Sequence, residues 1–252
     1  MKLSVIILTK DCVEELPICL GEMSFADEII VVDGDSTDGT LNDITKYELP
    51  IKVVHRTWND NFCDAWKFGE SFATGDWTLW WGSDEAATKE FSFKIHTFLE
   101  SVPACIDYVR FSLIDLVLDE KHYFRGSRDT MIGFLWNPHL FRKGKSICQS
   151  LPDGTEHILW DSKKSVFMDV VAKVHYKFLS ERRLRRKIWK PEHLELLFPE
   201  LVKAATLYCP GMGDDIKDGR MDFGTFIGEV PQYIEWNKLG VEGLKKLRLE
   251  IK

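Results

Sequence analysis

Short apolar segments, each followed at once by acidic and small residues, recur through the first third of the chain. They include residues 3–8, 28–32 and 77–81, and the last of these is rich in tryptophan. Continuous apolar strands are typical of a sheet that is covered on both faces. Open sheets of this kind bind ligands beyond the carboxyl ends of their strands. The acids that follow the three segments therefore predict one polar site at that edge of a sheet.

Segments with helical periodicity separate these strands. We expect helices over residues 13–23, 40–46 and 62–72, a further strand over 51–55, and a helix that Thr88 caps and that ends near residue 99. Strands that alternate with helices indicate βαβ units and a parallel sheet with helices on both faces.

The pattern changes after residue 105. Strands over residues 108–118 and 131–136 follow each other without a helix, which favours an antiparallel addition to the sheet. A strand over 166–174 comes next, and further helices are expected over 180–189, 191–207 and 241–249. The predicted fold class is α/β, with a mixed, mainly parallel sheet flanked by helices. We expect one domain over residues 1–190 and a mainly helical C-terminal extension over residues 191–252.

Charge and cysteine usage limit the class of protein. A net charge of -7 argues against a general nucleic-acid-binding protein, which needs a basic face to neutralise phosphates. The six cysteines include no Cys-x-x-Cys pair, so we expect reduced thiols and a cytoplasmic location, with Cys12 and Cys19 as small buried side chains. No apolar run is long enough to span a bilayer, and we expect no signal peptide, because residues 1–2 lead directly into a short strand. The basic stretch at residues 182–187 is either a solvated helix face or a peripheral contact with an anionic membrane.

Two strand ends carry the main candidates for ligand contact. Asp33 follows the 28–32 strand directly and opens a loop, residues 33–40, that is dense in Asp, Ser and Gly. The later polar residues of this loop either contact a ligand or cap the next helix. Asp84 and Glu85 follow the tryptophan-rich strand, and their hard oxygen atoms suit a divalent cation that itself holds phosphates. A solvated acidic turn is the competing interpretation for this pair.

Three other residues give weaker signals. His175 follows an apolar strand and is either a further ligand for a cation such as Mn²⁺ or a hydrogen-bonded structural histidine. Asp153 and Glu156 lie in a polar stretch between two structured regions, where a loop carboxylate can act as a general base.

Taken in order, these segments resemble the family 2 glycosyltransferases of the GT-A fold, especially short bacterial members that extend lipopolysaccharide core or similar glycans. The matching motifs are Ser-Val-Ile-Ile-Leu-Thr-Lys-Asp at residues 4–11, Asp-Glu-Ile-Ile-Val-Val-Asp-Gly-Asp-Ser-Thr-Asp-Gly-Thr at 27–40, and Ala-Thr-Gly-Asp-Trp at 73–77 with Ser-Asp-Glu at 83–85. The resemblance covers about residues 3–100, with an echo at residues 174–176.

The resemblance implies a hexosyltransferase-type enzyme that moves a sugar, with inversion, from a nucleotide-diphosphate donor to a hydroxyl of a glycan or glycoconjugate. The implied donor is a UDP-sugar, and the implied cofactor is Mn²⁺ or Mg²⁺, which offsets charge on the leaving diphosphate. The implied donor-binding residues are Thr9, Asp11, Asp33, Asp35, Lys67 and Ser83, with Asp33 at the base. The implied metal ligands are Asp84 and His175, and Glu156 is preferred to Asp153 as the general base.

The sequence departs from the family pattern in two places. Gly82 stands where the Asp-x-Asp-Glu motif has its first acid, and Trp66-Lys67 stands where the family has an Arg-Asn pair. Lys67 then offers the diphosphate a single ammonium charge instead of the two parallel N–H donors of an arginine. These departures favour a second class of function as the alternative, a non-catalytic relative that binds sugar nucleotides or glycans. A nucleotidyltransferase is disfavoured, because no Gly-rich loop carrying Lys or Arg for a triphosphate follows the first strand.

Overall fold

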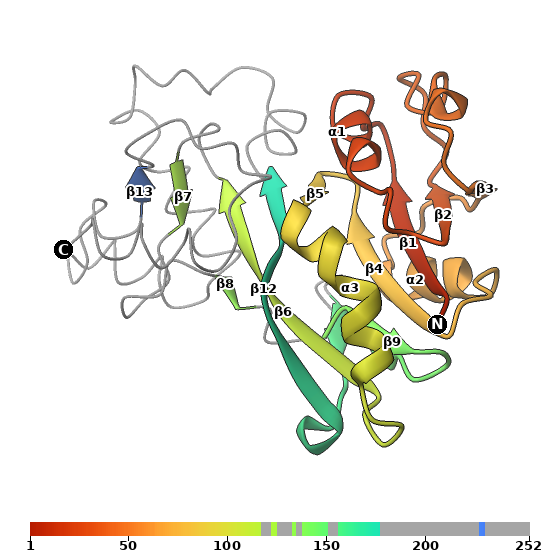
Figure 1. Cartoon of the computed structure of the whole chain (residues 1–252). Helices are drawn as coiled ribbons and strands as arrows, with labels where there is room; N and C mark the ends of the chain where they lie inside the picture. The colour runs from red at the N-terminus through yellow and green to blue at the C-terminus, as the bar shows by residue number, and fades with distance from the viewer. Residues whose placement is uncertain (117–121, 125–132, 135–137, 151–155, 177–226, 230–252) are drawn as a thin grey trace, which may run out of the picture.

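The computed structural model describes residues 1–116, 122–124, 133–134, 138–150, 156–176 and 227–229 (Figure 1). The expected domain boundary at residue 190, the expected C-terminal helices and the basic stretch at residues 182–187 lie outside these residues. Among the helices of the described part, none is both long enough and apolar enough to cross a membrane.

Four parallel strands form one end of the sheet, with β3 at its edge. They are β1 (Leu3–Thr9), β2 (Glu28–Asp33), β3 (Ile51–His55) and β4 (Trp77–Gly82), in the order β4-β1-β2-β3. The register pairs Thr9 with Asp33 and Leu8 with Gly82. The carboxyl ends of these strands therefore lie at one edge of the sheet, where the sequence places the acids (Figure 1).

Later strands widen the sheet beyond β4. β9 (Leu140–Arg142) pairs antiparallel with β4 and with β6 (Tyr108–Leu116). β12 (Ser165–Tyr176) runs parallel to β6, and β5 (Glu85–Ala87) pairs antiparallel with β12. The expected antiparallel addition is confirmed, while β12 shows that the later part of the sheet also contains a parallel pair.

Short strands complete the described structure. β8 (Gly133–Phe134) and β7 (His122–Phe124) pair with β6, and β13 (Ile227–Glu229) pairs with β7. β10 (Cys148–Ser150) and β11 (Glu156–Ile158) form a separate antiparallel pair.

Helices cover both faces of these parallel strands. α1 (Leu16–Gly21) and α3 (Lys89–Ser101) contribute to one apolar cluster, and α2 (Phe62–Glu70) contributes to the other. Side chains of β1 alternate between the clusters, with Val5 and Ile7 in the first and Ile6 in the second. This alternation explains why the strands are apolar throughout. The expected cap of α3 is confirmed, because Thr88 Oγ1 accepts a hydrogen bond from the Phe91 amide at 3.2 Å.

The helix expected over residues 40–46 is mostly a loop, and only Ile44–Lys46 forms a short 3-10 helix, η1. Polar side chains at the start of this loop accept hydrogen bonds from the segment after β1. Thr40 Oγ1 accepts a hydrogen bond from the Cys12 amide at 2.8 Å, and Asp38 accepts one from the Val13 amide at 3.0 Å. The helix prediction was wrong because side chains expected to cap the helix accept hydrogen bonds from a different segment of the chain.

Glu28 holds the Ala-Thr-Gly-Asp motif that precedes β4. Its carboxylate accepts hydrogen bonds from Ser4 Oγ and from the Thr74 amide and hydroxyl, and it pairs with Lys2 Nζ at 3.1 Å. Gly75 passes so close to β1 that a Cβ there would meet Ser4 Oγ at 2.5 Å. Burial alone would raise the pKa of Glu28, but the hydrogen bonds outweigh burial and lower the pKa to about 2.

Replacing Glu28 with Gln is expected to lower the free energy of unfolding at pH 7 by about 1–2 kcal/mol, because charge-assisted hydrogen bonds are lost. A carboxyl group with a depressed folded pKa stabilises the fold above its unfolded pKa and loses that contribution as the pH falls. Wild-type stability should therefore decline from about pH 4.5 toward pH 2, and more steeply than that of Glu28→Gln. Urea unfolding across this range measures both slopes. Glu100→Gln, at an exposed position of α3, serves as the control, and identical acid limbs for Glu28→Gln and wild type would contradict the assignment.

Candidate functional site

Asp33 is the last residue of β2, at the start of the loop that follows, and is only 2% exposed. Its Oδ1 accepts hydrogen bonds from Ser36 Oγ at 2.6 Å and from Thr9 Oγ1 at 3.3 Å, and its Oδ2 accepts one from the Ser36 amide at 3.1 Å. His55 Nδ1, at the end of β3, lies 3.4 Å from Oδ2. Asp33 thus joins the ends of β1, β2 and β3, and little of its carboxylate faces solvent.

Asp11 and Asp35 are the more accessible acids at this edge. Asp11 is half-buried and accepts a hydrogen bond from the Thr37 amide at 2.7 Å, whereas Asp35 is exposed. The structure therefore brings Thr9 and the three predicted acids into one loop cluster. It adds Ser36, Thr37 and His55, of which His55 was identifiable as the last residue of the third parallel strand.

The turn after β4 carries the second group of predicted residues. Asp84 Oδ2 lies 3.2 Å from His175 Nε2, and Ser83 is half-buried in the same turn. β12 delivers His175 to this place because its register pairs His175 with Glu85. The structure therefore brings the two predicted metal ligands together.

The donor atoms of this pair suit a hard or borderline divalent cation, since a carboxylate oxygen and an imidazole nitrogen both bind Mn²⁺. Within the described ranges, no group of three or more His, Cys, Asp or Glu side chains is arranged to hold a metal. Cations that bind phosphates commonly take only one or two protein ligands and complete their shell with substrate oxygens and water. Asp84 and His175 fit a cation of that kind.

Glu85, the residue after Asp84, is buried and interacts with core residues. Its Oε2 lies 2.5 Å from Nζ of Lys173, a fully buried side chain of β12, and accepts a hydrogen bond from the Gly82 amide at 2.7 Å. The Glu85 carbonyl accepts a hydrogen bond from Trp81 Nε1 at 2.9 Å, and the Lys173 ammonium lies 4.9 Å from the Trp81 ring centroid. Glu85 is therefore structural. Sequence analysis missed Lys173, although a single lysine in an apolar strand was a visible signal.

His139, just before β9, is close enough to Lys173 for the charge of that residue to affect its pKa. Burial lowers the pKa of His139 well below its usual value, and the positive charges of Lys173 and His175 lower it further. His139 therefore stays neutral at physiological pH. The charge buried next to the turn is that of the Lys173–Glu85 pair.

Gly82 stands where neighbouring side chains leave little room. A Cβ at this position would lie 2.8 Å from Asp84 Oδ1 and 3.1 Å from Glu85 Cδ. Below it, Cys19 Sγ donates to the Gly82 carbonyl at 3.6 Å. Burial, with the charges of Glu85 and Asp84, raises the pKa of Cys19 well above its usual value, so it remains a thiol. A side chain such as the family's first acid would therefore fit at this position only if Asp84 or Glu85 moved.

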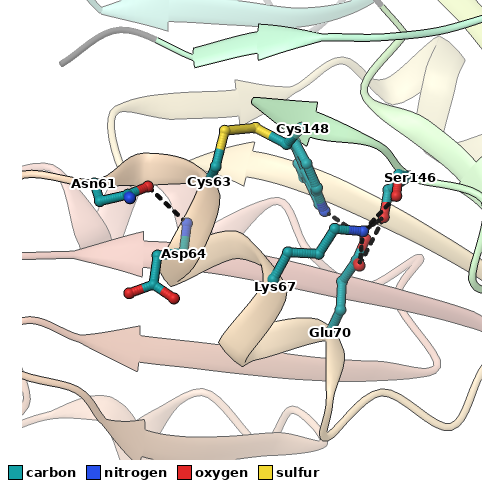
Figure 2. The surroundings of a disulfide bond; sticks show 8 residues. Asn61, Cys63, Asp64, Lys67, Glu70, Ser146 and Cys148 are labelled. Carbon is teal, nitrogen blue, oxygen red and sulfur yellow. Dashed lines mark hydrogen bonds and ion pairs between the residues drawn. A yellow bond between two sulfur atoms is a disulfide. The ribbon is translucent and has the colours of Figure 1, made fainter. Parts of the chain in front are cut away.

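Lys67 and Trp66 occupy the second point of departure, on α2. Lys67 Nζ is directed at Ser146, whose carbonyl accepts its hydrogen bond, and at Glu70 Oε2 at 3.0 Å (Figure 2). Trp66 is buried and stacks on Trp80 of β4, with ring centroids 5.1 Å apart and 3° between the planes. Trp66 is therefore a core residue, and the described contacts of Lys67 are with residues 70 and 146.

A disulfide joins Cys63 of α2 to Cys148 of β10, with 5.4 Å between the Cα atoms (Figure 2). This bond corrects the expectation of reduced thiols for these two residues. A separation of 85 residues leaves no local pattern that reveals such a pair. The expected burial of Cys12 and Cys19 is confirmed.

The two candidate general bases lie at the margin of the described chain. Glu156 begins β11, and its backbone pairs with Ser150 of β10. Asp153 lies outside the described residues. Since Cys148 is in β10, the disulfide links the strand that pairs with Glu156 to helix α2.

The chain matches the model of glycosyl transferase family 2 over residues 4–174 and therefore belongs to that family. A PGL/p-HBAD biosynthesis glycosyltransferase of Mycobacterium tuberculosis (strain H37Ra) is 35% identical over 91 residues, which are 33% of this chain and 35% of the relative. An uncharacterized glycosyltransferase of Rickettsia bellii is 33% identical over 101 residues, or 40% of this chain and 33% of the relative. The aligned part spans about a third of the length of these relatives.

Solved structures with the same fold include Staphylococcus aureus TarS. TarS 1-349 matches with a TM-score of 0.53 and 15% identity over 86% of this chain and 74% of that chain. The same TarS segment in complex with UDP matches with a TM-score of 0.51 and 15% identity over 89% of this chain and 76% of that chain. The expected GT-A fold is confirmed by this likeness together with the family match.

Replacing Gly82 with Ala is expected to lower the free energy of unfolding by about 1–3 kcal/mol, because the new methyl group must displace Asp84 or Glu85. Denaturant unfolding measures the change. Gly21→Ala is the matched control, since a Cβ there meets nothing within 4 Å and the helix should be unharmed. Equal stability of the two variants would contradict the crowding described for the turn.

Replacing both Cys63 and Cys148 with Ser is expected to lower the free energy of unfolding of the oxidised protein by about 2–4 kcal/mol, because the unfolded chain is no longer cross-linked. Cys105→Ser, at an exposed and unpaired cysteine, should have little effect. Urea unfolding with and without a dithiol reductant measures the difference. Rapid reaction of Cys63 and Cys148 with a thiol reagent in the folded, air-oxidised protein would contradict the bond.

Proposed function

We propose that the protein is an inverting glycosyltransferase that moves a sugar from a nucleotide-diphosphate donor, a UDP-sugar, to a hydroxyl of a glycan or glycoconjugate. The observation that carries the proposal is the Asp84–His175 pair, 3.2 Å apart beyond the carboxyl end of β4 and at the same edge of the sheet as Asp33. Family membership supports the reaction class, and the complex of TarS with UDP supports the nucleotide.

The loop cluster at the ends of β1, β2 and β3 is the proposed nucleotide site. Asp11 and Asp35 offer accessible carboxylates that accept hydrogen bonds from the base and ribose. Asp33, with Thr9 and Ser36, fixes the shape of the loop and has little capacity left for the base. Sequence reasoning gave Asp33 the contact with the base, and its burial shifts that role toward its neighbours.

The turn after β4 is the proposed diphosphate site. Asp84 and His175 would hold Mn²⁺ or Mg²⁺ there, with Ser83 next to Asp84 as a further contact to the donor. The cation, when bound, supplies positive charge that offsets the charge of the departing diphosphate. To contribute in the same way, Lys67 would have to leave Glu70 and Ser146.

Inversion requires a base on the acceptor side of the sugar. The carboxylate of Glu156 is the proposed base, with Asp153 as the alternative in the same polar stretch. The base accepts the proton of the acceptor hydroxyl as that oxygen bonds to the anomeric carbon. The electron pair of the broken carbon–oxygen bond leaves with the nucleoside diphosphate.

Replacing Asp84 with Ala is expected to lower kcat/KM for transfer by about 100-fold or more and to abolish the metal-dependent part of UDP binding, because one metal ligand is lost. A panel of UDP-, GDP- and dTDP-sugars with Mn²⁺ or Mg²⁺ measures transfer, and titration calorimetry measures UDP binding. Asp43→Ala removes an exposed acid of the same type and is the control. Equal activity of Asp84→Ala and wild type with every active donor would contradict the metal role.

Gly82 and Trp66 favour a second candidate, a relative that binds sugar nucleotides or glycans without turnover. This function predicts that UDP and Mn²⁺ raise the melting temperature while no product forms over long incubation with any donor. Appreciable transfer to any acceptor excludes it.

A further inference from the structure

The turn that carries Asp84 is fixed at both ends by Glu85. The Gly82 amide donates to the Glu85 side chain at 2.7 Å, and the Trp81 indole donates to the Glu85 carbonyl at 2.9 Å. A side-chain carboxylate that closes its own turn in this way also sets where Asp84, one residue earlier, is presented.

Burying a carboxylate is costly unless an opposite charge lies against it, and Lys173 supplies that charge. Lys173 is fully buried, its ammonium lies 2.5 Å from Glu85 Oε2, and the rings of Trp81 and Phe111 surround it at 4.9 and 6.0 Å. Removing one member of such a pair strands the other charge in an apolar environment. The position of Glu85 therefore depends on Lys173.

Lys173 and His175 lie two residues apart on β12, so their side chains leave the same face of the strand. They meet two consecutive acids of the turn, Lys173 with Glu85 and His175 with Asp84. The contact of Lys173 with Glu85 is buried, and the contact of His175 with Asp84 is partly exposed. The buried contact fixes the backbone from which the exposed pair projects.

We propose that Lys173 is a positioning residue for the metal-binding pair and that it acts on Asp84 and His175 through Glu85. The inference deepens the proposed function and rests on it for the identity of the bound ion. The arrangement of Asp84 against His175 in the ligand-free protein can be tested without that function.

The test is a double-mutant cycle with Lys173→Met, Glu85→Gln and the double variant. The glutamine side chain keeps an oxygen for the Gly82 amide, and the methionine side chain keeps most of the length of the lysine without its charge. Each single substitution is expected to raise the Kd for Mn²⁺ in the presence of UDP by about tenfold or more, as loss of support behind a metal ligand does. Because both act through one contact, the double variant should be about as weak as the weaker single variant, well short of the product of the two.

A second readout uses the ligand-free protein. The ring signals of His175 in the NMR spectrum, identified by their loss in His175→Gln, should shift in Lys173→Met and in Glu85→Gln. Lys164→Met is the matched control, since it removes the 3.5 Å ion pair with Asp107 at the opposite end of β12 and should leave His175 signals and Mn²⁺ affinity unchanged.

Folded Lys173→Met protein with wild-type His175 signals and wild-type Mn²⁺ affinity would overturn the proposal, as would fold-changes that multiply in the double variant. If Lys173→Met does not fold, Glu85→Gln decides alone, and unchanged His175 signals overturn the proposal. If wild type binds neither UDP nor Mn²⁺, the proposed function fails, and the His175 signals still decide the role of Lys173.

Discussion

The contact between Lys173 and Glu85 joins two parts of the chain that are remote in sequence and connects the core to the candidate site. Both charges are buried, and the cost of burying them is offset only while they remain together and their other bonds are made. The pairing of β5 with β12 brings them together. Asp84 and His175 depend on the same pairing, because Asp84 directly precedes Glu85 and His175 lies two residues after Lys173. Stability and site geometry therefore rest on one local arrangement at the end of β4.

The two-sided sheet explains why the polar groups gather at a single edge. Its strands carry apolar side chains to a cluster on each face, so polar groups are accommodated where strands end. In a parallel arrangement the carboxyl ends of β1, β2 and β4 lie together. The loop of Asp33 and the turn of Asp84 consequently face a common region, although one closes on hydrogen bonds and the other on a buried ion pair.

The sequence predicted the parallel core well because each of its strands is a continuous apolar run between polar turns. It also predicted that Asp84 and His175 meet, although His175 lies 91 residues further along the chain. It failed over residues 40–46, where Thr40 and Asp38 also accept hydrogen bonds from the segment after β1 and only a short 3-10 helix forms. It did not reveal the Cys63–Cys148 bond or the role of Lys173, because both depend on partners that only the folded chain brings near. It did not predict the burial of Asp33, since no sequence pattern says how many donors surround a carboxylate.

The parallel indoles of Trp66 and Trp80 have a further consequence, which concerns light and not chemistry. One ring belongs to the helix that carries Lys67 and the other to the strand that leads into the turn of Asp84, and the two are in face-to-face contact. Rings this close share excitation energy, so their ultraviolet emission depends on how the helix sits on the strand. Because the chain holds nine tryptophans, comparison with Trp66→Phe would isolate the contribution of this pair to the emission.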